Sequence, residues 1–375
     1  MRWIVSSLIA IAATTSVARA ATFAPVADFG ANPGALKAYD YIPDGLPADR
    51  PLVVVLHGCT QTAMAMQAGG WDKLADDYGF AVLFPEQQTA NNPVRCFNWA
   101  GEYGDQANMT RGQGENASIM AMIDNEIAMH AIDSKRVFVV GLSAGAAFTA
   151  VMLATWPDRF AAGSIMAGLP FKCATDVNGA YKCQSPGVVK TPAQWGDLVR
   201  GGYTGFTGSY PRVQIWQGTS DTTVAPANAD ELVKQWTNVH GADQIADQTE
   251  TIGMATRTAY QQGGQTVVEL YKIAGMGHGI AIGDDAGGPC TATAAAFFLD
   301  VHVCSTRRTA EFFGLLGSGG GSGSGSGSGG GGGGGGDVDA STDGNGGCAT
   351  GGGAGWMIAL AALGLGRTRR PTIAA

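Results

Sequence analysis

Short apolar runs rich in β-branched residues alternate with longer stretches of mixed polarity along most of this chain. Continuous apolar runs predict strands at 52–56, 80–84, 137–141, 161–166, 213–216 and 267–273, and a run that alternates at period two predicts an earlier strand at 36–42. The intervening stretches predict helices at 64–78, 115–129, 144–155, 228–239 and 291–303. This alternation predicts an α/β fold, with a mostly parallel central sheet and helices on both faces.

Both ends of the 375-residue chain differ in composition from the part between them. Arg2, an apolar run and the sequence Ala18-Arg19-Ala20 are typical of a secretory signal peptide, with a mature start at Ala21. Only Gly and Ser occur from Gly317 to Gly336, as in a flexible tether. The expected divisions are a signal peptide at 1–20, an α/β domain at 21–312, a flexible linker at 313–347 and a C-terminal segment at 348–375. Within the domain, residues 167–208 are rich in Gly, Pro and Cys and are expected to form an excursion over the top of the sheet.

Charge and motif spacing exclude several classes of ligand. The formal net charge is −8 and no basic tract occurs inside the domain, which argues against electrostatic binding of nucleic acid. No G-x-G-x-x-G stands between a predicted strand and a helix, so no dinucleotide cofactor is expected. No clustered spacing of Cys, His and Asp indicates a metal site.

Six of the seven cysteines lie in the predicted domain, at Cys59, Cys96, Cys173, Cys183, Cys290 and Cys304. An even number of cysteines in an exported chain favours disulfide bonds, with buried free thiols as the alternative. Fifteen pairings are possible, so the connectivity is open. Cys173 with Cys183 and Cys290 with Cys304 are close in sequence, and pairing them leaves Cys59 with Cys96.

Ser143 stands at the tip of a strand–turn–helix pattern, between Gly141 and Gly145. Small neighbours permit a sharp, strained turn that places the serine hydroxyl beyond the carboxyl end of the strand. The helix that follows offers the N–H of Ala144 to an oxyanion. Ser143 is therefore the candidate nucleophile, and an ordinary turn serine is the alternative.

Three polar residues each follow a predicted strand, in the order Ser143, Asp221 and His278. This is the chain order of α/β-hydrolases, and the carboxyl ends of parallel strands meet at one edge of a sheet. We expect His278 to take the serine proton as a general base and Asp221 to orient the imidazole. Asp230 and the acidic pair at 284–285 are alternative acids, but Asp221 directly follows a strand edge.

The second donor of an oxyanion hole is expected after the strand at 52–56, where His57, Gly58 and Cys59 follow. The backbone N–H groups of Cys59 and Ala144 form the predicted oxyanion hole. A disulfide at Cys59 leaves this donor in place, because it uses only the sulfur atom. A catalytic Cys59 thiol is the alternative.

Six motifs occur together along the chain, namely His57-Gly58-Cys59-Thr60-Gln61, Cys96-Phe97-Asn98-Trp99, Arg111-Gly112 with Glu115, Gly141-Leu142-Ser143-Ala144-Gly145, Gly218 with Asp221, and Gly277-His278. Jointly they resemble the polyhydroxybutyrate-depolymerase-like esterases, a family that includes the feruloyl and acetylxylan esterases of carbohydrate esterase family 1. The resemblance covers about residues 35–304 and implies a secreted serine esterase that acts through this triad and an acyl-enzyme, with no cofactor. Two positions depart from the family pattern: Gln217 stands where His is frequent, with an expected effect on the pocket wall, and Ala146 stands where Gly is frequent.

The resemblance implies an ester substrate without deciding which one. Hydroxyalkanoate oligomers and the acetyl or feruloyl esters of plant polysaccharides are both candidates, and a tether in place of a polymer-binding domain favours soluble oligomers or short esters. Trp99, Tyr103 and Trp216 are candidates for an apolar acyl or aryl pocket, with core packing as the alternative. Two other functions stay open: a prolyl-oligopeptidase-like peptidase on the same fold, and a non-catalytic surface protein, which the intact triad argues against.

The C-terminal segment resembles the sorting tags of exported myxobacterial proteins. It contains Gly346-Gly347-Cys348, an apolar run at 356–366 and terminal arginines, and the resemblance implies processing and anchoring at Cys348. The apolar run is shorter than the ~20 residues that a stable membrane span needs. We therefore expect an extracellular protein that contacts a membrane only through this tag, with a plain C-terminal membrane anchor as the alternative.

Overall fold

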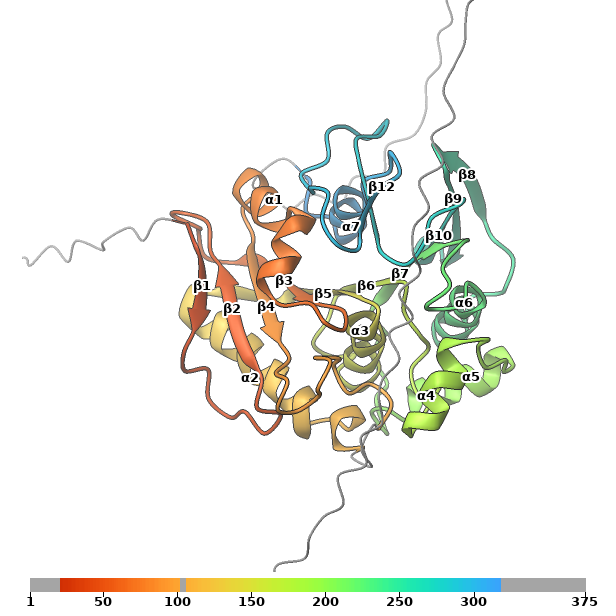
Figure 1. Cartoon of the computed structure of the whole chain (residues 1–375), viewed down its shortest axis with the longest axis horizontal. Coiled ribbons are helices and arrows are strands. Elements are labelled where there is room, and N and C mark those ends of the chain that lie inside the picture. Colours follow the sequence, from red (N-terminus) through yellow and green to blue (C-terminus); the bar gives the residue numbers. More distant parts are fainter. Residues whose placement is uncertain (1–20, 102–105, 318–375) are drawn as a thin grey trace, which may run out of the picture. The chain divides into compact units, whose positions relative to one another are not determined.

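A ten-stranded sheet runs through residues 21–101 and 106–317, the part of the chain that this computed structural model describes (Figure 1). Its strands lie in the order β1 (Phe23–Val26), β2 (Lys37–Tyr41), β4 (Ala81–Glu86), β3 (Arg50–Leu56), β5 (Ile132–Leu142), β6 (Ala162–Met166), β7 (Arg212–Gly218), β10 (Gln265–Ile273), β9 (Ala255–Gln262) and β8 (Gln248–Ile252). The strands from β4 to β10 in this order are parallel. The strands at both edges join them antiparallel. The predicted fold class is confirmed.

The chain divides into two units, Met1–Gly319 and Gly320–Ala375, and the described residues belong to the first. Its helices are η1 (Met64–Gly69), α1 (Trp71–Tyr78), η3 (Ala107–Met109), α2 (Gly114–His130), α3 (Ala144–Thr155), α4 (Val177–Gln184), α5 (Pro192–Arg200), α6 (Ala227–His240) and α7 (Ser305–Phe313). Two short parallel strands, β11 (Ile280–Ile282) and β12 (Phe298–Asp300), form a second sheet. The predicted signal peptide, most of the linker and Cys348 lie outside the described residues.

Each face of the large sheet has its own hydrophobic core, because side chains alternate between faces along a strand. In β3, Leu52 and Val54 belong to the core that α2 and α3 cover, whereas Val53 and Val55 belong to the core under α1 and α7. Figure 1 shows the same two layers on opposite sides of the sheet. A strand buried on both faces must be apolar throughout, which explains the continuous apolar runs of the sequence.

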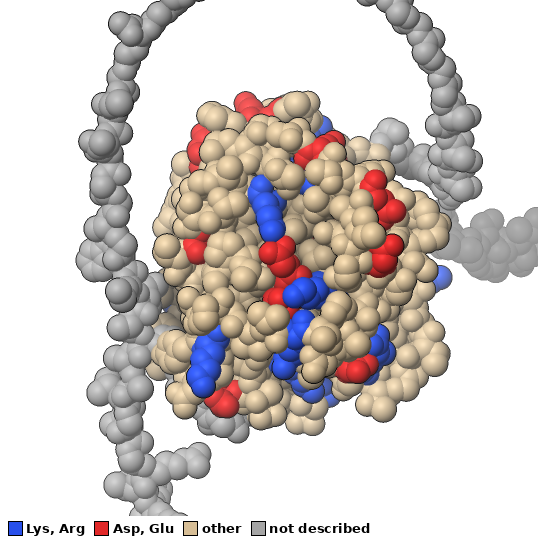
Figure 2. All heavy atoms as spheres, turned by 90° about the vertical axis from the view of Figure 1, so that its right-hand side faces the viewer, with Lys and Arg blue, Asp and Glu red and all other residues tan. Residues whose placement is uncertain are grey.

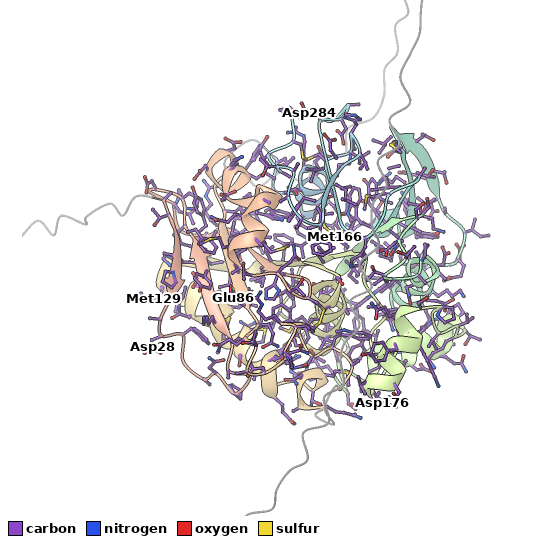
Figure 3. The ribbon with its side chains drawn as sticks, viewed as in Figure 1. Asp28, Glu86, Met129, Met166, Asp176 and Asp284 are labelled. Carbon is purple, nitrogen blue, oxygen red and sulfur yellow. A yellow bond between two sulfur atoms is a disulfide. The ribbon has the colours of Figure 1, made fainter. Side chains whose placement is uncertain are left out.

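Many charged side chains lie at the periphery of the molecule, where acidic and basic groups lie next to one another. Figure 3 shows Met166 inside the molecule and Asp28, Asp176 and Asp284 at its edge. Figure 2 shows the side that carries the antiparallel strands β8 and β9, where most basic side chains lie beside acidic ones. Lys272 of β10 pairs with Asp230, at 2.7 Å.

The predicted helix at 64–78 is divided at Gly70, between η1 and α1. Gly70 has a positive φ of 69°, and a Cβ atom on it would lie 2.4 Å from the carbonyl carbon of Thr291. The break therefore lets the loop that contains Thr291 approach the backbone closely.

The predicted helix at 291–303 is wrong. This segment contains β12, and the last helix, α7, begins at Ser305. A helix across it would hold the Cα atoms of Cys290 and Cys304 about 21 Å apart, whereas the disulfide between them holds these atoms 5.4 Å apart. The Ala-rich composition favoured a helix, and the covalent closure of the loop excludes it.

The fold continues past residue 312, because Phe313 and Leu315 are buried in the core under α7. The excursion at 167–208 contains two helices that the sequence analysis missed, α4 and α5. A capping box between Thr191 and Gln194, with Pro192 in the first turn, starts α5 and was a readable signal. Strands β8 and β9 were also missed, since most of their side chains are exposed or half-buried and lack an apolar run.

Three disulfide bonds join Cys59 to Cys96, Cys173 to Cys183, and Cys290 to Cys304. These are the pairs expected from the sequence. No helix within the described ranges is long and apolar enough to cross a membrane.

Replacing Phe313 by Ala is expected to lower the free energy of unfolding by about 3–5 kcal/mol. The Phe313 ring is buried and stacks on Phe138 at 4.6 Å between ring centroids. Glu311→Ala, on the exposed side of the same helix, is the control, and its effect should stay below about 1 kcal/mol. Urea unfolding measures both, and equal stabilities of the two variants would contradict this packing of α7.

Candidate active site

Ser143 occupies the turn between β5 and α3 in a strained conformation. Its φ is 56° and its ψ is −119°, outside the regions that L-residues ordinarily adopt. Its backbone N–H donates to the carbonyl oxygen of Met166 at 2.9 Å, which ties the turn to the end of β6. Such strain is typical of a nucleophile held at the tip of a strand–turn–helix unit.

The glycines on both sides of Ser143 are required by close backbone contacts. A Cβ atom on Gly141 would lie 2.3 Å from the carbonyl oxygen of Gly145. A Cβ atom on Gly145 would lie 2.4 Å from the carbonyl oxygen of Leu56, at the end of β3. The first turn of α3 therefore packs directly against both β5 and β3, as the sequence analysis expected on steric grounds.

His278 and Asp221 lie side by side although 57 residues separate them. The imidazole Nδ1 is 2.8 Å from Asp221 Oδ2, and both side chains are largely buried. The other carboxylate oxygen, Oδ1, accepts the backbone N–H groups of Thr223 and Val224 at 2.8 and 2.9 Å. Asp221 is thus held in place by its own loop while it faces the imidazole.

The other candidate acids have different partners. Asp230 pairs with Lys272, and Asp285 pairs with Arg308 at 2.8 Å. Asp284 is exposed and accepts the backbone N–H of Cys290. Within the described residues, no hydrogen bond links the Ser143 hydroxyl to His278; in an unliganded site this contact is often long and shortens when substrate binds.

Gln217 is buried beside Asp221 and takes part in this arrangement, a role that the sequence analysis did not assign. Its Nε2 donates to Asp221 Oδ2 at 3.1 Å, the same oxygen that faces His278, and to the carbonyl oxygen of Val224 at 3.3 Å. The side chain points at the carboxylate, so the expectation that it shapes the pocket wall is replaced by a positioning role. The available signal for this role was the family pattern, which often has His, another hydrogen-bond donor, at this position.

His57 orients the peptide bond between Gly58 and Cys59. The backbone N–H of Gln87 donates to His57 Nε2 at 3.0 Å, so the proton of the neutral ring is on Nδ1, which donates to the carbonyl oxygen of Gly58 at 2.7 Å. Because a trans peptide bond points its N–H away from its C=O, this bond turns the Cys59 N–H away from His57. Burial lowers the pKa of His57 to about 4, so the ring is neutral at pH 7.

The two predicted oxyanion donors have no acceptor within the described part of the chain. Among the described residues, no backbone or side-chain oxygen accepts the N–H of Cys59 or of Ala144. Ala144 opens α3, where the first N–H groups of a helix have no acceptor within the helix. A Cβ atom on Gly58 would lie 3.4 Å from the Ser143 Cβ, so the loop that carries Cys59 lies against the serine.

A buried carboxylate on α2 is hydrogen-bonded to residues that contact the loop carrying Cys59. Glu115 accepts hydrogen bonds from the side chain of Gln87 at 2.6 Å, from the backbone N–H of Asn98 at 2.9 Å, and from the Asn98 side-chain amide. Gln87 Nε2 also donates to the carbonyl oxygen of Cys96 at 3.2 Å. Glu115, Gln87 and the 96–99 motif therefore form one polar network that ends at His57.

Two of the three aromatic residues considered for a substrate pocket belong to the core. Trp216 is 2% exposed and stacks on Tyr271 at 3.8 Å between ring centroids, and Trp99 is 8% exposed and packs in the core under α2 and α3. Tyr103 lies outside the described residues. The packing alternative holds for both tryptophans.

Comparison with known proteins places this geometry in a family. Residues 36–259 match the family described as Esterase PHB depolymerase. The chain is 52% identical over 293 residues to poly(3-hydroxyalkanoate) depolymerase C of Paucimonas lemoignei, an alignment that covers 78% of this chain and 70% of that protein. It is 34% identical over 281 residues to feruloyl esterase B of Neurospora crassa, covering 72% and 93% of the two chains.

This chain belongs to the PHB depolymerase esterase family. A solved structure, the acetyl xylan esterase from Aspergillus awamori, superposes with a TM-score of 0.66 at 28% identity, covering 79% of this chain and 100% of that one. The protein is therefore a serine carboxylic-ester hydrolase of the α/β-hydrolase fold, as the motifs predicted. The esterase function therefore replaces the two alternatives, a prolyl-oligopeptidase-like peptidase and a non-catalytic surface protein.

Replacing Gln217 by Leu is expected to lower kcat of the esterase about tenfold, with little change in KM. The variant removes one donor from the Asp221 oxygen that faces His278, and a hydrogen bond to a charged group is worth about 1.5–3 kcal/mol. Gln217→His, which supplies a donor again, should recover most of the rate. Hydrolysis of a p-nitrophenyl ester measures all three proteins, and an unchanged kcat in Gln217→Leu would contradict the positioning role.

The stability that neutral His57 contributes is expected to fall in acid. The unfolded chain protonates His57 near pH 6.5, whereas the folded esterase protonates it only near pH 4. The contribution is therefore complete above pH 6.5 and decreases as the pH falls from 6.5 towards 4, with about 2 kcal/mol lost by pH 5.

His57→Asn keeps a side-chain donor for Gly58 but does not titrate. Urea unfolding should show the wild type losing about 2 kcal/mol relative to this variant between pH 7 and pH 5. His302→Asn, at an exposed histidine, is the matched control and should follow the wild type. A gap between wild type and His57→Asn that does not change with pH would show that His57 is not buried as a neutral ring.

Proposed function

We propose that Ser143, His278 and Asp221 form the catalytic triad of a secreted esterase. The observation that carries this proposal is the 2.8 Å contact between His278 Nδ1 and Asp221, at the sheet edge where the strained Ser143 turn also lies. That contact leaves Nε2 of the same ring available to the serine hydroxyl. A buried carboxylate behind the imidazole selects this tautomer and stabilises the imidazolium.

The reaction follows from this arrangement in two steps. His278 Nε2 takes the proton of Ser143 as its Oγ attacks the ester carbonyl, and the resulting oxyanion accepts hydrogen bonds from the N–H groups of Cys59 and Ala144. The imidazolium then gives its proton to the departing alcohol, which leaves an acyl-enzyme on Ser143. Water, deprotonated by His278, attacks this acyl group and releases the acid.

Esters of 3-hydroxyalkanoic acids are the proposed substrates. The support is the 52% identity to poly(3-hydroxyalkanoate) depolymerase C, against 32–34% to the feruloyl esterases. Acetylated or feruloylated polysaccharides are the second candidate, supported by relatives such as the probable acetylxylan esterase A of Aspergillus fumigatus at 37% identity. Both candidates are acyl groups joined to an alcohol oxygen, so one triad serves either.

Secretion is supported by the predicted signal peptide and by the three disulfide bonds, which persist in oxidising compartments. Attachment to the cell surface through Cys348 is proposed on the resemblance of the C-terminal segment to a sorting tag. Mass analysis of the mature protein tests both: a start at Ala21 and loss of Arg370 are expected.

A panel of esters tests the substrate class. Hydroxybutyrate trimer, amorphous polyhydroxybutyrate, methyl ferulate and acetylated xylan are compared by kcat/KM, with Ser143→Ala as the blank. Hydroxybutyrate esters are expected to be preferred by at least tenfold. A preference of the same size for methyl ferulate or acetylated xylan would assign the polysaccharide branch instead.

Removing the nucleophile or the acid is expected to separate their roles. Ser143→Ala should lose both ester hydrolysis and labelling by a fluorophosphonate probe, while Asp221→Asn should lower kcat roughly 10³–10⁴-fold because the wrong tautomer is favoured. Asp230→Asn, at an exposed aspartate paired with Lys272, should keep the wild-type rate. Full activity of Asp221→Asn would move the acid to another residue.

A further inference from the structure

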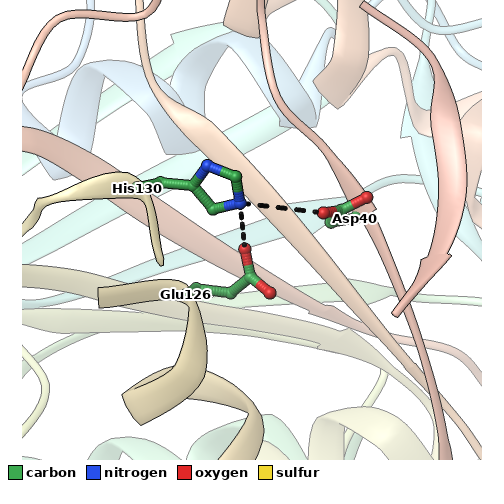
Figure 4. Close-up of side chains that lie close together, drawn as sticks. All are labelled: Asp40, Glu126 and His130. Atoms are coloured by element: carbon green, nitrogen blue, oxygen red, sulfur yellow. Dashed lines mark ion pairs between the residues drawn. The ribbon is translucent and has the colours of Figure 1, made fainter. Parts of the chain in front are cut away.

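A buried cluster of two carboxylates and an imidazole lies outside the catalytic site. It joins Asp40 of β2 to Glu126 and His130 of α2 (Figure 4). His130 Nε2 is 3.5 Å from Glu126 Oε2 and 4.0 Å from Asp40 Oδ2. Within the described ranges, no other group of three His, Cys, Asp or Glu side chains comes this close.

One atom of the cluster lacks a hydrogen-bond partner. Glu126 is 1% exposed, and no group in the described part of the chain donates a hydrogen bond to its Oε2, which faces the His130 ring at 3.5 Å (Figure 4). A buried carboxylate oxygen without a hydrogen-bond partner is costly, and a bound cation is one way to offset that cost. The unsatisfied oxygen is therefore an independent sign that the cluster holds a positive ligand.

The geometry fits a small divalent ion. His130 Nε2 lies 3.5 and 4.0 Å from the two carboxylate oxygens, and the ligand atoms all lie within 4.8 Å of one another. A point equidistant from the three is therefore at most about 2.4 Å from each, close to the 2.0–2.2 Å of zinc bonds to His and carboxylate. Glu126 and His130 are four residues apart on α2, which places both on one helix face. They end the helix, where the helix dipole favours a cation.

The cluster is open to solvent on one side. A surface cavity of about 430 Å³ is lined by Asp40, His130 and Ala131, among others. The His130 side chain is 30% exposed, so an ion and one or two waters could reach it. This opening supplies the entry path and the water ligands that three protein donors leave free.

We propose that Asp40, Glu126 and His130 bind a divalent metal ion, with zinc as the best fit. The ion joins β2, the second strand of the sheet, to the end of α2. Its role is structural, because His130 precedes the amino end of β5 whereas Ser143 follows the carboxyl end, with the 11-residue strand between them. The proposal is independent of the triad.

A proton could satisfy the same oxygen in place of a metal. Burial, together with the nearby Asp40 carboxylate, raises the pKa of Glu126 to about 7. Measurements at pH 8 therefore favour the metal, and measurements at pH 6 favour the proton. The experiment below is designed to distinguish the two.

The full chain, purified without a polyhistidine tag and stripped with EDTA, is titrated with zinc, manganese or calcium chloride at pH 8. Zinc is expected to bind one ion per chain and to raise Tm by about 5 °C at a hundredfold excess over Kd. EDTA should reverse the shift without lowering the ester hydrolysis rate at 25 °C. A wild-type Tm that responds to none of the three metals would overturn the proposal.

Two variants and two controls locate the site. Glu126→Gln and His130→Gln should lose the zinc-dependent shift, while Asp124→Asn, on the exposed side of α2, and His302→Asn, at an exposed histidine, should keep it. Glu126→Gln removes a buried charge, so its metal-free Tm should equal or exceed that of the wild type, which separates lost binding from misfolding. A zinc shift that survives in both cluster variants, or disappears in His302→Asn, would place the ion elsewhere and refute the site.

Discussion

The position of the Cys59 N–H, the proposed oxyanion donor, depends on a buried carboxylate of another element. Glu115 is buried on α2 and is tolerated there because it accepts hydrogen bonds from Gln87 and Asn98. Gln87 in turn fixes the tautomer of His57, and His57 holds the peptide bond that presents the Cys59 N–H. Because every member of this network is hydrogen-bonded, it links α2 rigidly to the proposed oxyanion donor.

The two ends of the parallel strands have different tasks. At the carboxyl ends, the loops after β3, β5, β7 and β10 carry Cys59, Ser143, Asp221 and His278. The loops after β7 and β10 approach so closely that a Cβ atom on Gly218 would lie 2.3 Å from the carbonyl oxygen of Met276. At the amino end, α2 returns to the sheet, and the cluster of Asp40, Glu126 and His130 joins its last turn to β2. The proposed catalytic residues and the cluster of Asp40, Glu126 and His130 thus lie at opposite ends of the parallel strands.

Most of the fold and the four candidate catalytic positions could be predicted because their signals are local. Continuous apolar runs marked the buried strands, and small residues around Ser143 marked a turn whose sterics the structure makes explicit. The helix expected at 291–303 failed for a local reason too: its composition suited a helix, but Cys290 and Cys304 could not have paired across one. Combining the two expectations would have exposed the conflict.

Other features were invisible because they arise only from packing. Strand β8 carries mostly exposed side chains and owes its existence to pairing with β9. Gln217 contacts Asp221 because the loop after β7 folds back onto it, and the one available signal was the donor, His, that the family often has at this position. Asp40 lies far from Glu126 in sequence, so no motif spacing could indicate that they share a site. Long-range polar contacts of this kind need coordinates.

The bond between Cys59 and Cys96 has a practical consequence for making the protein. One of the two proposed oxyanion donors, the Cys59 N–H, belongs to a half-cystine, so the covalent state of that sulfur bears directly on the loop that carries this donor. In a reducing bacterial cytosol the chain could reach its overall fold while this disulfide bond stays reduced. Production through the periplasm, or refolding with a glutathione couple, therefore lets the disulfide form, so that the soluble protein is also the active protein.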